Sequence, residues 1–172
     1  QTGLLDVALV ILVAATIEEI IFRAVLFQTL ESQWGTVAAL WLQSLIFSLL
    51  HIANLDAEMD AVALGITVLS GTLIGAFWTI LYVYVRNVWV VAAHHAAWNF
   101  TQGYLFGAAV SGGDFGSAMA RSTARGGLPD WLTGGAFGPE ASLPSVAICS
   151  ILGAAALWLA WKAGRFSTYP AR

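Results

Sequence analysis

Charged residues are scarce in this sequence. Its 172 residues include seven Lys or Arg and ten Asp or Glu, so that 10% are charged and the formal net charge is −3, while 59% are hydrophobic. Soluble domains are about 25% charged, because a charged surface keeps a folded chain dispersed. The composition therefore excludes a soluble globular domain, and the abundance of apolar residues excludes a disordered chain. Seven scattered basic residues also exclude a nucleic-acid-binding protein.

Cysteine is nearly absent as well. The single cysteine, Cys149, permits neither an internal disulfide nor a thiolate metal cluster, and its apolar neighbours predict a small core residue. A signal peptide of the ordinary kind is also missing. The first basic residue is Arg23, so no positively charged region precedes the first apolar run.

Long apolar runs take up most of the chain. A helix needs about 20 mostly apolar residues to cross about 30 Å of hydrocarbon. Five ranges are candidates for such helices: residues 4–28, 36–52, 59–84, 88–110 and 145–163. They predict an all-α transmembrane helical bundle with about five spans, forming a single domain over residues 1–172. The glycines and prolines of residues 111–144 predict a long loop between the last two spans.

Several polar side chains lie inside these apolar ranges, where hydrophobicity should exclude them. The set comprises Glu18, Glu19, Arg23, His51, His94, His95 and Asn99. A charged side chain at the centre of a bilayer costs at least ~2.5–3.5 kcal/mol. Such groups are therefore functional candidates, although a structural ion pair or a core histidine is the simpler interpretation of any one of them.

Helix geometry separates the roles of the two neighbouring glutamates. Successive residues of a helix turn by about 100°, so Glu18 and Glu19 face different ways. Glu19 and Arg23 are four residues apart and can pair on one face. We predict that this pair is structural and holds Glu18 in place. A lone buried carboxyl suits general acid or base chemistry, and we predict that role for Glu18.

The histidines can be sorted in the same way. His95 and Asn99 are four residues apart and share a helix face, whereas His94 points about 100° away. Phe47 and His51 share a face of the second range. Because three helices each contribute intramembrane polar groups, a shared functional site is favoured over isolated structural residues.

The order and spacing of these residues resemble a known family. The motifs Glu18-Glu19-x-x-x-Arg23, Phe47-x-x-x-His51 and His95-x-x-x-Asn99 resemble those of the CPBP family of intramembrane proteases, the CAAX prenyl protease and bacteriocin-processing group. The tract 133–142 also resembles bacterial members, so that the resemblance runs from about residue 14 to residue 142. Members usually carry more helices upstream, which favours a chain that is part of a longer protein.

The resemblance implies an intramembrane endopeptidase that hydrolyses a peptide bond in or beside the bacterial inner membrane. It implies that Glu18 and His51 activate water and that His95 and Asn99 stabilise the oxyanion. Glu19, Arg23 and Phe47 are expected to support these groups. The implied partners are membrane lipid and a peptide or protein substrate, whose C-terminus can be lipidated. The sequence leaves the oligomeric state open.

The need for a metal is a separate question. Two histidines and a glutamate are the ligands of some catalytic zinc sites, so Glu18, His51 and His95 would hold zinc or another divalent metal if one is bound. Members of the family are commonly described as metalloproteases. We favour a mechanism that requires no cofactor, because Glu18 cannot easily be both a ligand and a free base.

Other functions are compatible with the same buried groups. Other intramembrane proteases fit less well, since the chain has no His-Glu-x-x-His, no Gly-x-Ser-Gly and no pair of intramembrane aspartates. A proton-coupled transporter could use the buried groups as a relay, although the absence of an internal repeat disfavours it. In a non-enzymatic membrane scaffold or immunity factor, the same residues would be structural.

Overall fold

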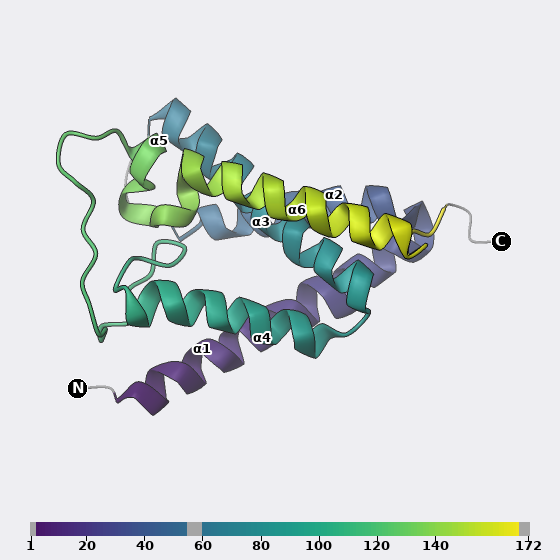
Figure 1. Ribbon diagram of the computed structural model, residues 1–172, viewed down its shortest axis with the longest axis horizontal. Coiled ribbons are helices and arrows are strands. Elements are labelled where there is room, and N and C mark those ends of the chain that lie inside the picture. Colours follow the sequence, from purple (N-terminus) through teal and green to yellow (C-terminus); the bar gives the residue numbers. More distant parts are fainter. Residues whose placement is uncertain (1–2, 55–59, 169–172) are drawn as a thin grey trace.

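The computed structural model describes residues 3–54 and 60–168, and it is helical (Figure 1). The α-helices are α1 (Leu4–Glu19), α2 (Gln28–Ile52), α3 (Ala61–Val85), α4 (Val88–Asn99), α5 (Asp130–Thr133) and α6 (Leu143–Lys162). The π-helical segments are η1 (Ile20–Phe27) and η2 (Phe100–Leu105), and the short 3-10 turns are η3 (Gly135–Phe137) and η4 (Pro139–Ala141). No β-strand occurs among the described residues. The structure thus confirms the all-α helical bundle.

The helices pack around α3. Helix α3 lies against both α2 and α6, while α1 packs along α4 (Figure 1). The core between α2 and α3 is built from aromatic and aliphatic side chains, among them Phe47, Trp78 and Tyr82. The long loop after η2 and the short helix α5 lie at the same end of the bundle (Figure 1). The polar groups singled out above come from α1, η1, α2 and α4.

The helices lie close to the expected ranges. Helical backbone runs without a break from Leu4 to Trp34, through α1, η1 and the start of α2. Gly35 then adopts a φ of 77°, a conformation that glycine reaches without strain, and separates this stretch from the rest of α2. The fourth helical segment ends at Leu105, five residues before the expected end at residue 110. Met59, the first residue of the third range, lies outside the described residues.

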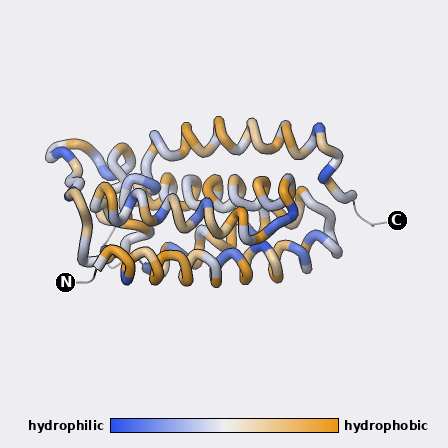
Figure 2. The backbone as a smooth tube through the Cα atoms, turned by 60° about the horizontal axis from the view of Figure 1, so that its bottom comes forward, coloured by the Kyte–Doolittle hydropathy of each residue, from blue (hydrophilic) through white to orange (hydrophobic). Residues whose placement is uncertain are grey.

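Two of the described helices, α3 and α6, are long and apolar enough to cross a membrane. The other expected spans differ for identifiable reasons. Helices α1 and α4 pass into π-helical turns after 16 and 12 residues, and α2 begins with a polar stretch before its kink. Large apolar side chains are nevertheless exposed along several helices, and hydrophobic residues recur along the tube in Figure 2. An apolar exterior of this extent is typical of a surface that contacts lipid.

A small residue lets α2 and α3 approach closely near the candidate site. A Cβ atom added at Gly71 would lie 2.6 Å from the hydroxyl oxygen of Ser48. Small residues at a helix contact allow the two backbones to come together. This approach sets the position of the last turn of α2, which carries His51.

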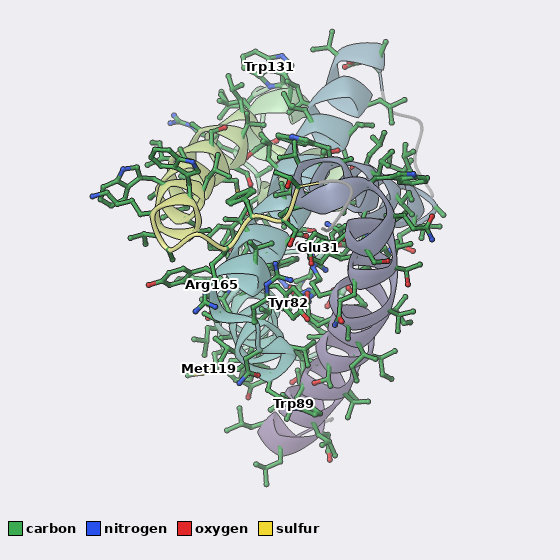
Figure 3. The ribbon with its side chains drawn as sticks, turned by 90° about the vertical axis from the view of Figure 1, so that its right-hand side faces the viewer. Glu31, Tyr82, Trp89, Met119, Trp131 and Arg165 are labelled. Carbon is green, nitrogen blue, oxygen red and sulfur yellow. The ribbon has the colours of Figure 1, made fainter. Side chains whose placement is uncertain are left out.

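One end of the bundle is fastened by Arg86, in the turn between α3 and α4. Its guanidinium donates hydrogen bonds of 2.6 and 2.8 Å to the carboxylate of Glu31 and one of 3.0 Å to the backbone carbonyl of Arg165. Figure 3 looks onto this end of the bundle, with Glu31, Tyr82 and Arg165 labelled. The hydrogen bonds to Glu31 raise the pKa of Arg86. The contact joins α2, the α3–α4 turn and the segment after α6.

We expect Arg86→Ala to lower the free energy of unfolding by about 1 kcal/mol. A bidentate charged contact is stronger than an ordinary surface pair, but Arg86 is partly exposed and solvent screens it. The measurement is the thermal unfolding midpoint in detergent micelles, and the loss should shrink in high salt. Arg121→Ala, in the exposed loop, is the control and should leave the midpoint unchanged. Equal midpoints for Arg86→Ala and wild type at low salt would contradict the prediction.

Candidate active site

Two carboxylates lie side by side in sequence at the junction of α1 and η1, yet they enter different environments. The side chain of Glu18 is 34% exposed and lines a cavity, whereas that of Glu19 is fully buried. The helical rotation between consecutive residues accounts for this divergence. The two glutamates can therefore serve different chemical roles, as their spacing predicted.

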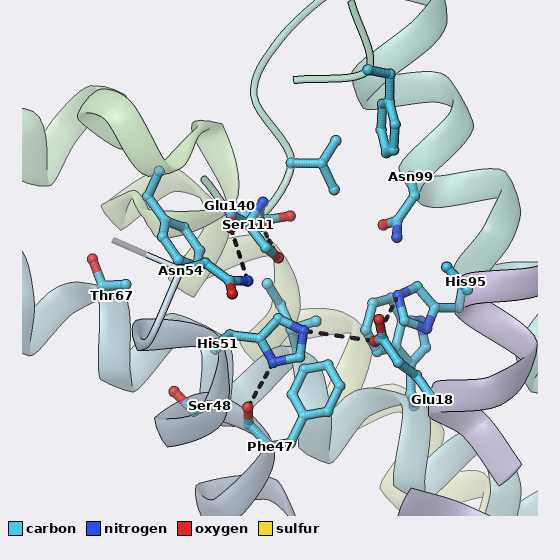
Figure 4. A pocket seen from close by; sticks show the side chains of 17 residues that line it. Glu18, Phe47, Ser48, His51, Asn54, Thr67, His95, Asn99, Ser111 and Glu140 are labelled. Atoms are coloured by element: carbon cyan, nitrogen blue, oxygen red, sulfur yellow. Dashed lines mark hydrogen bonds and ion pairs between the residues drawn. The ribbon is translucent and has the colours of Figure 1, made fainter. Parts of the chain in front are cut away.

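Glu18 faces two imidazole rings across the cavity (Figure 4). Its Oε2 atom lies 3.6 Å from Nε2 of His51 and 3.9 Å from Nε2 of His95. The same oxygen is buried and has no hydrogen-bond partner. Residues separated by up to 77 positions in sequence thus present one carboxylate oxygen and two ring nitrogens to a common space.

The ring of His51 is held by Phe47, one turn earlier in α2. Its Nδ1 lies 2.7 Å from the backbone carbonyl oxygen of Phe47, which can only accept, so Nδ1 carries the proton. The two rings are also in contact, with centroids 4.2 Å apart. His51 consequently turns Nε2 toward Glu18. The spacing Phe47-x-x-x-His51 therefore serves to orient the imidazole.

The ring of His95 is held by two other side chains. Its Nδ1 donates to Oε1 of Glu19 at 2.8 Å, and the indole of Trp78 stacks on the ring at a centroid distance of 3.8 Å. A carboxylate acceptor on Nδ1 fixes the orientation of the ring and places a proton on that nitrogen. The free Nε2 of His95 then points into the cavity, toward Glu18.

Glu19 and Arg23 form a fully buried ion pair. Nη1 of Arg23 donates to Oε1 of Glu19 at 3.1 Å, and Nη2 donates to the backbone carbonyl of Gly75 in α3 at 3.0 Å. The guanidinium also lies 5.0 Å from the centroid of the Phe47 ring. The pair was predicted to hold Glu18. In the structure its direct contact is with His95, since Oε1 of Glu19 accepts from both Arg23 and that ring.

Both π-helical segments directly follow site residues. Segment η1 begins after Glu19 and contains Arg23, and η2 begins after Asn99. A π-helical turn contains more residues than an α-turn and is frequent at functional sites. The regular 3.6-residue period applies within α1 and α4, but it does not continue through the segments after them.

The cavity has a volume of about 190 Å³ and is lined by residues from α1, α2, α3, α4 and the long loop. A single water needs only about 10–15 Å³ of such space, so that the cavity has room for several waters. Asn99 lines it together with Glu18, His51 and His95, on the side of α4 (Figure 4). His94 does not line it, and its Nδ1 accepts a 3.1 Å hydrogen bond from Trp78. The cavity supplies the polar space that water needs inside a membrane protein.

Sequence reasoning did not identify three residues of this site. Trp78 stacks on His95, and Ser111 and Glu140 line the cavity from the loop. Nothing in the local sequence of Trp78 distinguishes it from a lipid-facing aromatic. Glu140 lies in the tract 133–142, whose resemblance to bacterial members was the available signal. Burial raises the pKa of Glu140.

That the site works without a metal stays a prediction. Among the described residues, no group of three His, Cys, Asp or Glu side chains is arranged to hold a metal ion. Glu19 is already engaged, since its Oε1 accepts hydrogen bonds from Arg23 and from His95.

When the chain is compared with known proteins, one family model matches it. The family model described as Type II CAAX prenyl endopeptidase Rce1-like matches residues 1–101, which is more than half of the chain. The matched range includes Glu18, His51, His95 and Asn99. No curated protein and no solved structure matches the chain.

Proposed function

The chain belongs to the Rce1-like type II CAAX prenyl endopeptidase family of integral membrane proteases, and from this premise we propose that it hydrolyses peptide bonds with a water activated by Glu18 and His51. The observation that carries the proposal is the convergence of Oε2 of Glu18 with Nε2 of His51 and of His95, at 3.6 and 3.9 Å. Amide hydrolysis requires a base for the attacking water and donors for the oxyanion, and residues suited to both roles line one cavity.

In the first step, Glu18 takes a proton from water as the water oxygen attacks the carbonyl carbon of the scissile bond. His51 supports this step, because its Nδ1 proton is engaged by Phe47 and its Nε2 lone pair can accept a hydrogen bond from the same water. The C–O bond forms, and the carbonyl oxygen becomes an oxyanion. The protonated Glu18 then gives its proton to the leaving nitrogen as the C–N bond breaks.

The oxyanion is stabilised by His95 and Asn99. With Nδ1 of His95 donating to Glu19, the ring donates through Nε2 when it is protonated. The Asn99 side-chain amide, which lines the same cavity, is the second donor. One such donor is typically worth ~2.7–4 kcal/mol of transition-state stabilisation.

The substrate is a peptide or protein, as in the family. We propose a substrate tethered at the membrane, with a C-terminus that can carry a lipid, and a location in the bacterial inner membrane. The test is cleavage of membrane-tethered peptides by the purified protein in lipid vesicles, followed by mass spectrometry. Release of defined peptide products supports an endopeptidase. Proton-coupled solute flux without any cleavage would identify a transporter instead.

We expect the reaction to need no metal ion. Incubation with EDTA or 1,10-phenanthroline, followed by removal of the chelator, should leave the cleavage rate within about twofold of the untreated rate, because Glu18 acts as a free base. The measurement pairs this rate with the metal content of the same sample. Loss of activity together with a bound metal, and its recovery on adding Zn²⁺, would contradict the metal-free mechanism.

A further inference from the structure

Glu140 is a buried carboxylate that the proposed reaction does not use. It lies in η4, just before α6, and only 7% of the residue is exposed. Its side chain lines the cavity, and Figure 4 shows it across the cavity from Glu18. Burying a carboxylate is costly unless hydrogen bonds compensate, so its partners indicate what it holds.

The Glu140 carboxylate gathers donors from two other parts of the chain. Oε1 accepts hydrogen bonds from the backbone N–H of Ser111 and from its hydroxyl, the latter at 2.7 Å. Oε2 accepts from the side-chain amide of Gln102 in η2 at 3.2 Å, and that amide also donates to the carbonyl of Ala109. The backbone carbonyl of Glu140 accepts from the hydroxyl of Ser70 in α3. One residue thus joins η2, the loop around Ser111 and α3.

The loop held in this way is strained where Glu140 contacts it. Ser111 has a φ of 47°, in the left-handed region that residues other than glycine rarely adopt. Two backbone hydrogen bonds between Val110 and Gly113, of 2.9 and 2.8 Å, close the turn around it. Such a conformation persists only when the surroundings enforce it. The carboxylate satisfies both donors of Ser111 and thereby keeps Val110 and Ser111 on the cavity wall.

The contacts of Glu140 suit a carboxylate and would not suit the amide of a glutamine at the same position. All three groups that contact the carboxylate are donors. A carboxylate is an acceptor at both oxygens, whereas a carboxamide has the same shape but presents an NH2 group on one side. That NH2 would oppose a donor of either Ser111 or Gln102. Glu140→Gln therefore keeps the shape of the side chain and removes one acceptor.

We propose that Glu140 is a positioning residue that fixes the wall formed by Val110 and Ser111, against which the substrate peptide lies when its scissile carbonyl faces Glu18. This inference rests on the proposed function. Glu140 acts through the wall and not on the reacting atoms. Loosening the wall weakens substrate binding and leaves the catalytic groups on α1, α2 and α4 in place.

The test is the steady-state kinetics of Glu140→Gln in lipid vesicles. We expect KM to rise about tenfold or more and kcat to change by less than threefold, because the variant loses binding that is shared by the ground state and the transition state. Asp130→Asn makes the same acid-to-amide change at an exposed position, the first residue of α5, and should leave both constants unchanged. Ser111→Ala keeps the backbone donor and should raise KM by a smaller factor. An unchanged KM in Glu140→Gln overturns the inference, as does a fall in kcat without a rise in KM.

A parallel assay of Glu18→Gln separates this inference from the proposed function. If Glu18→Gln is inactive and Glu140→Gln has wild-type kinetics, the proposed function stands and only the role of Glu140 is refuted. If Glu18→Gln still cleaves, the proposed function fails, and amide hydrogen exchange then tests the wall independently. Exchange in residues 107–116 should be at least about tenfold faster in Glu140→Gln than in wild type or Asp130→Asn. Equal exchange rates in Glu140→Gln and wild type would overturn the inference in that case too. If Glu140→Gln folds too poorly for kinetics, Ser111→Ala takes its place in the exchange experiment, and exchange like that of wild type in Ser111→Ala would overturn the inference.

Discussion

Replacing Glu18 with glutamine is expected to abolish peptide cleavage and to leave the protein folded. The amide keeps the size of the side chain and its place in the cavity but cannot accept a proton from water. General base catalysis typically contributes about 10²–10⁴-fold, so kcat should fall by about 10³-fold or more. Because the Glu18 side chain is partly exposed and its Oε2 makes no hydrogen bond that the substitution would break, the unfolding midpoint should change little.

The measurement is the rate of product formation by mass spectrometry, alongside thermal unfolding of the same preparation. Asp6→Asn is the matched control, since it makes the same change on the exposed surface of the same helix. It should retain wild-type kcat. Wild-type turnover by Glu18→Gln would show that Glu18 is not the base. Glu18→Asp, whose carboxylate is withdrawn by one methylene, should retain partial activity.

The second large effect is expected at the buried ion pair. Arg23→Ala leaves the Glu19 carboxylate without its cation, and Glu19→Ala leaves a guanidinium uncompensated. Both side chains are fully buried. Breaking a buried pair by removing one partner typically costs about 3–5 kcal/mol. Each single variant should therefore give a much lower yield of folded protein and a lower unfolding midpoint, measured in detergent with Arg121→Ala as the exposed control.

A double variant separates folding from the orientation of His95. Replacing a buried pair by neutral groups of similar size is often tolerated, so Glu19→Gln combined with Arg23→Met should recover most of the folded yield. The glutamine replaces the carboxylate that accepts from Nδ1 of His95 by a neutral amide, which holds the ring less firmly. We therefore expect kcat to remain about 10²–10³-fold below wild type, the effect of losing one oxyanion donor. If both alanine variants melt like wild type and are inactive, the structural role of the pair is wrong.

The catalytic candidates could be chosen from the sequence because helices have a fixed period. Four-residue spacing placed Glu19 beside Arg23 and His95 on the face of Asn99, and the 100° rotation directed Glu18 away from Glu19. These relations are local and need no knowledge of the fold. His51 lies near the end of its apolar range, and the cavity extends to this last turn of α2.

Contacts between distant segments could not be found in this way. Glu19 and His95 are 76 residues apart, and their hydrogen bond exists only because α1 packs along α4. Trp78 stacks on His95 because α3 packs against α4. The regular helical period did not predict the π-helical turns η1 and η2.

The sequence by itself determined that this chain is apolar and helical, and which polar residues share each helix face, because hydrophobicity and helical periodicity are properties of short segments. Only the tertiary structure decided which of those faces meet, that the Glu19–Arg23 pair supports His95, and that the loop contributes Glu140 and Ser111 to the cavity wall. Those arrangements depend on how helices and loops far apart in sequence pack together, and the physical interactions that fix them act across space and not along the chain.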